Sequence, residues 1–331
     1  MAMMRKLYFI PLLVLLLPSC RQDIVSEVDF TVAMDLENTY YAGEPVRFLF
    51  RRASVDNLLF YSGENGSRYE YRDRRIVPTE QVRSVSIDFE FLARYGVDGG
   101  FDVYISNSFE GLKGNDADAD KAEIRSWEDA MDEDGNIPGW TRLPYEEGPN
   151  GVWTYQSFDL SDYIDNFAVA FHWHPRAQGS AAQRTYGVNG NIVLDVDGAD
   201  PSVITLPELG IIPVMMNDEI EDPYMMNSKN GSICFDNSAA QVYFQGAAYQ
   251  ELDYQIDGWA VSVPCALNRI QNDKGTVIKT QENDIRCFDY VYGRPGTYVA
   301  TFVGTNVNYL HRDYSVKNVK LFIIDKPHDC Q

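Results

Sequence analysis

Aromatic side chains are the residues of this sequence best suited to bind a neutral, hydroxyl-rich ligand. A flat ring packs against the C–H face of a sugar, while neighbouring polar groups bind its hydroxyls. Trp140 follows an Ile-Pro-Gly turn in an expected exposed loop, and Tyr145 lies five residues further on. Trp153 and Trp173 fall within expected strands, where packing in the core is the alternative to ligand contact. We therefore expect Trp140 and Tyr145 to be the first stacking candidates, followed by Trp153 and Trp173.

Two histidines, His172 and His174, flank Trp173. Residues two apart on a strand share a face, so both imidazoles could reach one ligand or one metal ion. Two ligands do not complete a metal site, and the other histidines, His311 and His328, belong to a different expected domain. No metal site is therefore predicted here. The alternatives are a solvent-facing pair and a pair that contacts sugar hydroxyls.

Acidic residues after Gly111 alternate in a way that is typical of the start of a calcium loop. An EF-hand needs Gly at the sixth position and Glu at the twelfth, where this sequence has Lys121 and Trp127. A looser structural calcium site is one alternative, and a solvated acidic loop is the other. The weak calcium candidates are Asp116, Asp118, Asp132 and Asp134. No other cofactor is expected.

Catalytic signatures are missing from the sequence. It has no GxSxG elbow, no HExxH motif, no phosphate-binding Gly loop and no dinucleotide fingerprint. The 49 Asp and Glu residues leave room for a glycosidase pair by count, but nothing in the pattern would place two carboxylates about 5–9 Å apart. The net charge of −21 argues against nucleic acid as a partner. We expect a protein without enzymatic activity.

The N-terminal residues predict export. Arg5 and Lys6 precede an apolar run from Leu7 to Leu17, which is too short to span a bilayer and has the length of a signal-peptide core. The Leu-Pro-Ser-Cys sequence that ends at Cys20 resembles a bacterial lipobox. We therefore expect residues 1–20 to be a lipoprotein signal peptide with lipidation at Cys20, the alternative being an ordinary secretory signal. The expected location is the outer membrane, with membrane contact through the lipid anchor only. Exposure at the cell surface is favoured, and a periplasm-facing orientation is the alternative.

Four further cysteines allow three disulfide pairings: Cys234, Cys265, Cys287 and Cys330. Disulfides form outside the cytoplasm, where this chain is expected. Cys265 and Cys287 lie in neighbouring strand-like segments of one expected domain, which favours a bridge between them. The alternative is that all four are buried free thiols.

Short alternating segments separated by turn residues predict an all-β protein from Val28 onward. Residues 27–78 are typical of an immunoglobulin-like sandwich in size. A longer β region follows over residues 82–248, and strongly alternating segments predict a second sandwich over residues 249–326.

A family resemblance is carried by the segments AGEPVRFLF, FYSGENGSRYEYRD, ISNSFEG, IRSWEDAMD and DLSDYID followed by VAFHWHP. Together they resemble an uncharacterised lipoprotein family of polysaccharide-utilisation loci, which is catalogued under a domain of unknown function. The segment GTYVATFVGTN likewise resembles a strand pair of PKD domains. The resemblance implies PKD-like sandwiches that flank a jelly-roll-like domain of the carbohydrate-binding type. It implies no particular binding residues.

The function implied by this resemblance is capture of polysaccharide at the cell surface for a SusC/SusD-type outer-membrane importer. The expected partners are a polysaccharide or oligosaccharide and that importer. Two alternatives stay open. One is a structural or adhesin-like lipoprotein without glycan affinity, and the other, less favoured, is a glycan-active hydrolase.

Overall fold

The computed structural model describes residues 25–34, 39–176, 182–224, 231–236, 239–247 and 254–326. The expected signal peptide with Cys20, and also Cys330 and His328, lie outside the described residues. In the described part of the chain, strands predominate and the one α-helix is α1 (Ala117–Ala130). The prediction of an all-β protein is therefore confirmed.

The chain divides into two compact units, not three. The described residues within 1–72 and 274–331 form unit 1, and those within 73–273 form unit 2. The expectation of two separate flanking sandwiches, over residues 27–78 and 249–326, is corrected by this division. Strands near both ends of the chain pair with each other to build a single sandwich, which alternation within each segment does not reveal.

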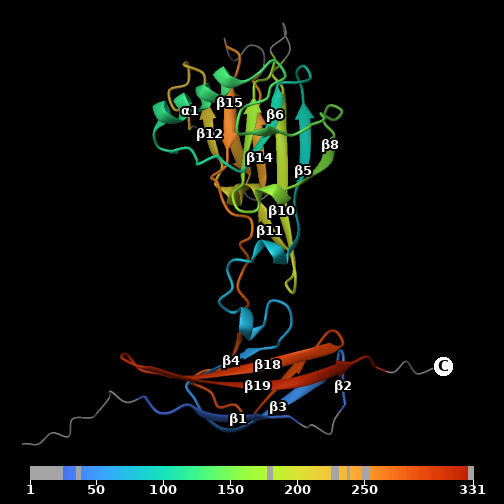
Figure 1. Cartoon of the computed structure of the whole chain (residues 1–331), viewed down its shortest axis with the longest axis vertical. Helices are drawn as coiled ribbons and strands as arrows, with labels where there is room; N and C mark the ends of the chain where they lie inside the picture. Colours follow the sequence, from blue (N-terminus) through green and yellow to red (C-terminus); the bar gives the residue numbers. More distant parts are fainter. Residues whose placement is uncertain are drawn as a thin grey trace, which may run out of the picture. The chain divides into compact units, whose positions relative to one another are not determined.

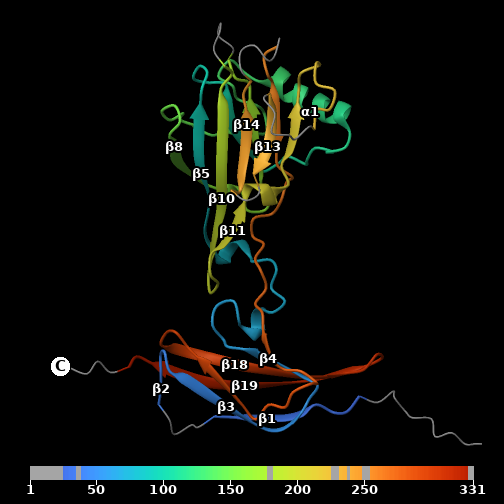
Figure 2. The ribbon, with the colours of Figure 1, turned by 180° about the vertical axis from the view of Figure 1, so that it is seen from behind.

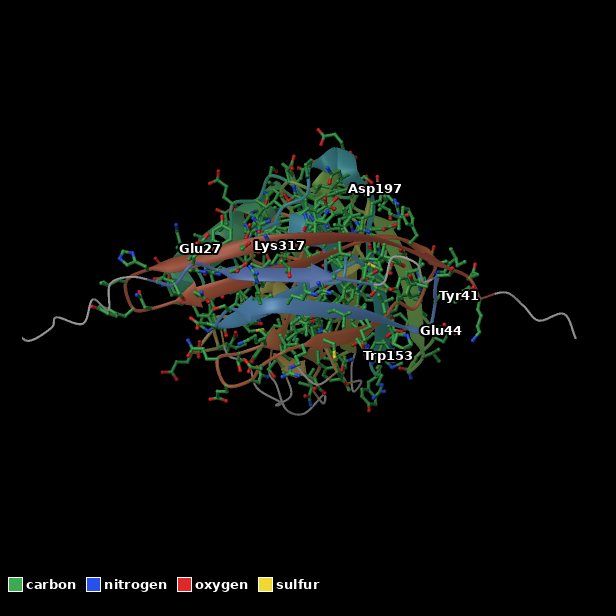
Figure 3. The ribbon with its side chains drawn as sticks, turned by 90° about the horizontal axis from the view of Figure 1, so that it is seen from below. Glu27, Tyr41, Glu44, Trp153, Asp197 and Lys317 are labelled. Carbon is green, nitrogen blue, oxygen red and sulfur yellow. The ribbon has the colours of Figure 1, made fainter. Side chains whose placement is uncertain are left out.

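Unit 1 consists of two sheets (Figure 1). The three-stranded sheet has the order β1 (Asp29–Ala33), β3 (Pro45–Ser54), β17 (Cys287–Val291). The five-stranded sheet has the order β16 (Thr276–Lys279), β4 (Asn57–Tyr61), β18 (Gly296–Val307), β19 (Arg312–Ile324), β2 (Tyr40–Tyr41). Neighbouring strands are antiparallel except β19 and β2, which are parallel. The long β18 and β19 run across the unit, with Glu27 toward one end and Tyr41 toward the other (Figure 3).

Phenylalanine rings from both ends of the chain meet in the core of unit 1. The ring of Phe302 on β18 contacts Phe48 on β3 at 5.1 Å and Phe60 on β4 at 5.1 Å between centroids. All three side chains are almost fully buried. Burying one such ring contributes about 1.5–3 kcal/mol, so the N-terminal and C-terminal segments stabilise each other.

Unit 2 is a second sandwich, which presents its larger sheet in the view from behind (Figure 2). This sheet has the order β13 (Ser232–Asp236), β14 (Gln241–Gln245), β10 (Thr185–Val196), β5 (Val82–Arg94), β8 (Trp153–Asp159), and β11 (Ser202–Thr205) also pairs with β10. The five-stranded sheet has the order β12 (Ile212–Met215), β15 (Gly258–Val261), β9 (Ala168–Trp173), β6 (Phe101–Ser106), β7 (Thr141–Arg142). Because β15 pairs with β9 and β12, the expected boundary near residue 249 is also corrected.

Two apolar layers stabilise unit 2. The first fills the space between the sheets, where Phe89 of β5 meets Phe171 of β9 at 6.0 Å. The second lies on the outer side of the five-stranded sheet and includes Ile124 and Trp127 of α1 with Trp259 of β15. The helix therefore covers part of that outer face, and its buried side chains fix its position on the sheet.

The favoured disulfide is not formed. Cys265 and Cys287 are both free thiols, as is Cys234. Cys265 belongs to unit 2, where its backbone pairs with Phe167, whereas Cys287 lies on β17 of unit 1, opposite Leu49. The segments that contain the two cysteines are neighbours in sequence but belong to different units, which corrects the expectation that they share one domain.

Candidate ligand-binding site

Helix α1 begins where the sequence predicted an acidic loop. The carboxylate of Asp116 accepts a hydrogen bond from Ala119 N at 3.2 Å and caps the helix. Asp118 and Asp120 follow in the first turn, where negative charge is favourable. The alternating aspartates thus start a helix, which corrects the alternative of a solvated loop at this point.

Asp120 fixes the helix to the segment that follows β6. Its side chain is buried and accepts hydrogen bonds from Lys113 N at 2.6 Å and Gly114 N at 2.7 Å. The hydroxyl of Tyr224 donates to the same carboxylate at 2.6 Å. Three donors to one buried charge hold this segment in place beside α1.

The weak calcium candidates do not converge. Asp132 accepts hydrogen bonds from Asn136 N at 2.8 Å and Asp134 N at 3.0 Å, as in a tight turn. Hydrogen bonds from the side chain and backbone of Asn136 lower the pKa of Asp132. Within the described residues, the groups of three or more side chains close enough to share an ion contain none of Asp116, Asp118, Asp132 and Asp134.

Three aromatic rings meet beside α1. Trp140 contacts Phe109 at 5.1 Å and Trp127 at 5.1 Å, and Phe109 contacts Trp127 edge-on at 5.4 Å. Phe109 and Trp127 are buried, whereas Trp140 is half-buried. The two buried rings therefore support Trp140, which keeps part of its surface accessible.

This aromatic trio lines a pocket of about 530 Å³ in unit 2. The hydroxyl of Ser106 donates to Gly139 O at 2.7 Å and accepts from Phe109 N at 3.1 Å, so it joins the two loops that carry the rings. Trp127 Nε1 donates to Glu123 Oε1 at 3.1 Å. The polar side chains that also line the pocket are Ser106, Ser108, Glu110, Lys113, Asp120 and Glu123.

Tyr145 does not join Trp140 in this pocket. Its ring packs against Phe91 at 4.6 Å and Phe101 at 5.6 Å, in the apolar layer between the sheets. Burial raises the pKa of Tyr145. The expected pairing of Trp140 with Tyr145 is corrected because the two rings lie on opposite sides of the five-stranded sheet.

The two strand tryptophans have different surroundings. Trp173 is fully buried, contacts Phe244 at 5.8 Å and donates from Nε1 to Arg184 O at 3.2 Å, so it is a core residue and not a ligand contact. Trp153 on β8 is 40% exposed. It belongs to the larger sheet, and the end of its indole lies over Gly187 of β10, where a Cβ would approach it to 3.2 Å. Trp140 and Trp153 therefore cannot contribute to one pocket.

The rings of His172, on β9, and His174, one residue past the end of β9, lie with centroids 4.2 Å apart. His172 is buried and stacks on Trp259, whereas His174 is partly exposed. His174 contacts Asp102. Burial raises the pKa of Asp102, but hydrogen bonds from His174 and Arg142 lower it by more, so that the pKa falls to about 2. The expectation of a solvent-facing pair is thus corrected for His172.

Sequence reasoning missed Phe109, Glu123 and Asp102. Phe109 lies three residues after the end of β6, in a segment without regular structure, so strand alternation gives no signal for it. Glu123 and Trp127 are four residues apart, which places them on one side of a helix once α1 is recognised. Asp102 needed the register of β6 on β9, where it lies opposite His172.

Among the described residues, no helix has the length and apolar character that crossing a membrane requires.

The comparisons with known proteins place the chain in a family. Neither the comparison with curated proteins nor that with solved structures gave a match. Residues 19–203, more than half of the chain, match the family described as "Domain of unknown function (DUF5017)". The chain therefore belongs to the DUF5017 family.

Proposed function

We propose that this chain is a non-catalytic, glycan-binding lipoprotein, and that the pocket beside α1 binds a segment of polysaccharide. The observation that carries the proposal is the half-buried Trp140, supported by Phe109 and Trp127 at the wall of that pocket. A ring held in this way loses little conformational entropy when a sugar packs on it.

The size and lining of the pocket support the same assignment. Its volume of about 530 Å³ falls in the range of small-ligand sites, about 300–1,000 Å³. Hydroxyl, carboxylate and ammonium groups from Ser108, Glu110 and Lys113 lie at the pocket and are exposed. These groups can exchange hydrogen bonds with sugar hydroxyls, which an apolar pocket would leave unpaired.

The cellular setting rests on the N-terminal sequence and on the resemblance to lipoproteins of polysaccharide-utilisation loci. Acylation at Cys20 would tether the chain to the outer membrane, because several acyl chains give stable anchoring. Tethered next to a SusC/SusD-type importer, many weak binding events would raise the local concentration of polymer. The chain captures glycan in this proposal, and separate enzymes cleave it.

The test uses residues 21–331 on a glycan array, followed by affinity electrophoresis with each polysaccharide that binds. Trp140→Ala should abolish the retardation of migration, because the pocket loses its accessible ring. Trp153→Ala is the matched control, since it removes an exposed tryptophan from the other sheet and should leave the retardation unchanged.

The other outcomes distinguish the alternatives. Loss of retardation in Trp153→Ala alone would place the glycan on the larger sheet and overturn the pocket assignment. No binding to any glycan by the unmodified chain would favour the structural or adhesin-like role. Release of oligosaccharide products would favour a hydrolase.

A further inference from the structure

A cluster of histidines and carboxylates lies on the outer face of the five-stranded sheet of unit 2. Asp102 on β6 is the register partner of His172 on β9, and His174 follows two residues later. A carboxylate oxygen of Asp102 and one ring nitrogen from each histidine all lie within 4.8 Å of one another. These three side chains come from segments about 70 residues apart and meet only because β6 pairs with β9.

The separations inside the cluster are close to those of a metal site. His174 Nε2 lies 2.9 Å from Asp102 Oδ2, and one ring nitrogen of His172 lies within 4.8 Å of the ligand atoms of both. Two ligand atoms of a tetrahedral zinc ion, each at about 2.0–2.1 Å from the metal, are about 3.3 Å apart. Small side-chain rotations would therefore be enough to admit an ion.

His172 has the surroundings of a metal-binding histidine. It is 8% exposed, and its Nδ1 is buried without a hydrogen-bond partner. A ligating imidazole is normally held through its other nitrogen by a carboxylate, which is the relation of His172 Nε2 to Asp257. Stacking on Trp259, with ring planes inclined by 8°, fixes the ring orientation.

The charges around the cluster favour a cation. Asp102 and Asp257 each contact a histidine, and Glu128 lies close enough to His172 and Asp257 to form a second potential ligand group. The guanidinium of Arg142 offsets one of these three carboxylates, and it binds Oδ1 of Asp102, leaving Oδ2 toward His174.

We propose that Asp102, His172 and His174 bind one divalent transition-metal ion of borderline softness, such as Zn²⁺, with Asp257 orienting His172. Two imidazoles favour such an ion over calcium, which prefers oxygen ligands only. Three protein ligands leave a fourth position for water or an additional ligand. This site does not depend on the proposed glycan binding.

The experiment uses residues 21–331 without a histidine tag, stripped with a chelator and titrated with ZnCl₂ by calorimetry. We expect one Zn²⁺ per chain, and a higher melting temperature with Zn²⁺ because the ion binds the folded state. Titration with Co²⁺ should give visible absorption bands. A stoichiometry of zero, or an equal melting shift with CaCl₂, would overturn the proposal.

Variants test the individual ligands. His174→Ala removes a partly exposed ligand and should weaken Zn²⁺ binding at least tenfold, and Asp102→Asn should do the same if His174→Ala fails to fold. His311→Ala is the matched control because His311 is an exposed histidine of unit 1. Equal Zn²⁺ affinity in His311→Ala and in a folded ligand variant would contradict the assignment.

Discussion

The imidazole of His172 lies flat on the indole of Trp259, with ring centroids 4.1 Å apart. The same indole meets Trp127 edge-on at 5.6 Å, and Trp127 contacts Trp140 at 5.1 Å. A continuous run of ring contacts therefore joins the proposed metal site to the proposed glycan pocket. Trp259 contacts both His172 and Trp127, so a substitution of Trp259 should affect both the metal site and the pocket.

The hydrogen bond from Trp259 gives the first prediction. Trp259 Nε1 donates to Glu128 Oε1 at 2.9 Å. Burial raises the pKa of Glu128, and this hydrogen bond opposes the rise. Trp259→Phe keeps a ring beside His172 but leaves the half-buried carboxylate without this donor. We expect the free energy of unfolding, measured in urea at pH 7, to fall by about 1–3 kcal/mol.

Trp127→Phe is the control for this change. It also removes an indole N–H from a buried ring, but its acceptor, Glu123, is exposed and can bind water instead. The loss of stability should therefore be clearly smaller. Equal losses from the two substitutions would contradict the role assigned to the Trp259–Glu128 hydrogen bond.

The second prediction concerns Asp120, which holds the segment of residues 113–114 beside the pocket. Asp120→Asn replaces an ionised acceptor of three hydrogen bonds with an amide, which accepts through one oxygen only. We expect a loss of about 2–3 kcal/mol in the free energy of unfolding, and weaker glycan retardation. Asp118→Asn removes the same charge from an exposed position of α1 and should change stability by less than about 0.5 kcal/mol. Similar losses in both would show that only the charge of the first turn matters.

Alternation of buried and exposed residues predicts where strands lie in this chain, but not which strands pair. In β5, Val85, Ile87 and Phe89 are buried and alternate with more exposed residues, which is the pattern that predicted a strand there. Alternation does not say which strands pair. β3 pairs with β17, more than 230 residues later in the chain. The alternation within each of these strands would be the same if they belonged to two separate sandwiches, so it does not reveal the pairing.

In the candidate site too, local sequence predicts single residues but not which of them meet. The loop position and residue type of Trp140 predict an accessible ring, but only its closeness in sequence associates Tyr145 with Trp140. β7 ends at Arg142 and Tyr145 N donates back to Leu143 O, so the chain turns here; Tyr145 enters the layer between the sheets while Trp140 lies in the outer layer. Asp102 could not be assigned to the histidines without the β6–β9 register, which long-range pairing determines.

The third prediction tests whether unit 1 needs strands from both ends of the chain to fold. A chain that stops after Asp273 lacks β17 and β18, the partners of β3 and β4. The apolar side chains of β3 and β4 would then be exposed, and we expect residues 25–72 to be digested rapidly by a protease of broad specificity. Unit 2 contains all of its own sheet partners and should resist digestion as in the full chain. Mass spectrometry of the fragments provides the measurement. Protection of residues 25–72 in the truncated chain would contradict this prediction and would favour an N-terminal sandwich that folds on its own.

The last prediction concerns the pH dependence of the N-terminal cap of a short 3₁₀ helix in unit 2, η4 (Leu206–Leu209). Hydrogen bonds from Thr205, through its backbone N at 2.7 Å and its hydroxyl at 2.8 Å, lower the pKa of Glu208 below the ordinary value of 4.5. A carboxyl group with a depressed native pKa stabilises the fold above its unfolded pKa, and this contribution is lost as the pH falls through the native pKa.

We therefore expect Glu208→Gln to lower the free energy of unfolding by about 0.5 kcal/mol at pH 7, a small effect because the group is exposed to solvent. The difference from the unmodified chain should shrink as the pH falls below about 4.5, where the unfolded carboxyl group becomes protonated, and should vanish below the lowered native pKa. Urea denaturation at pH 7 and at pH 3.5 measures both. Glu80→Gln, in the first turn of the 3₁₀ helix η2 (Thr79–Gln81), controls for the change in net charge. A constant difference between the unmodified chain and Glu208→Gln at both pH values would mean that the charge of Glu208 is not what stabilises the cap.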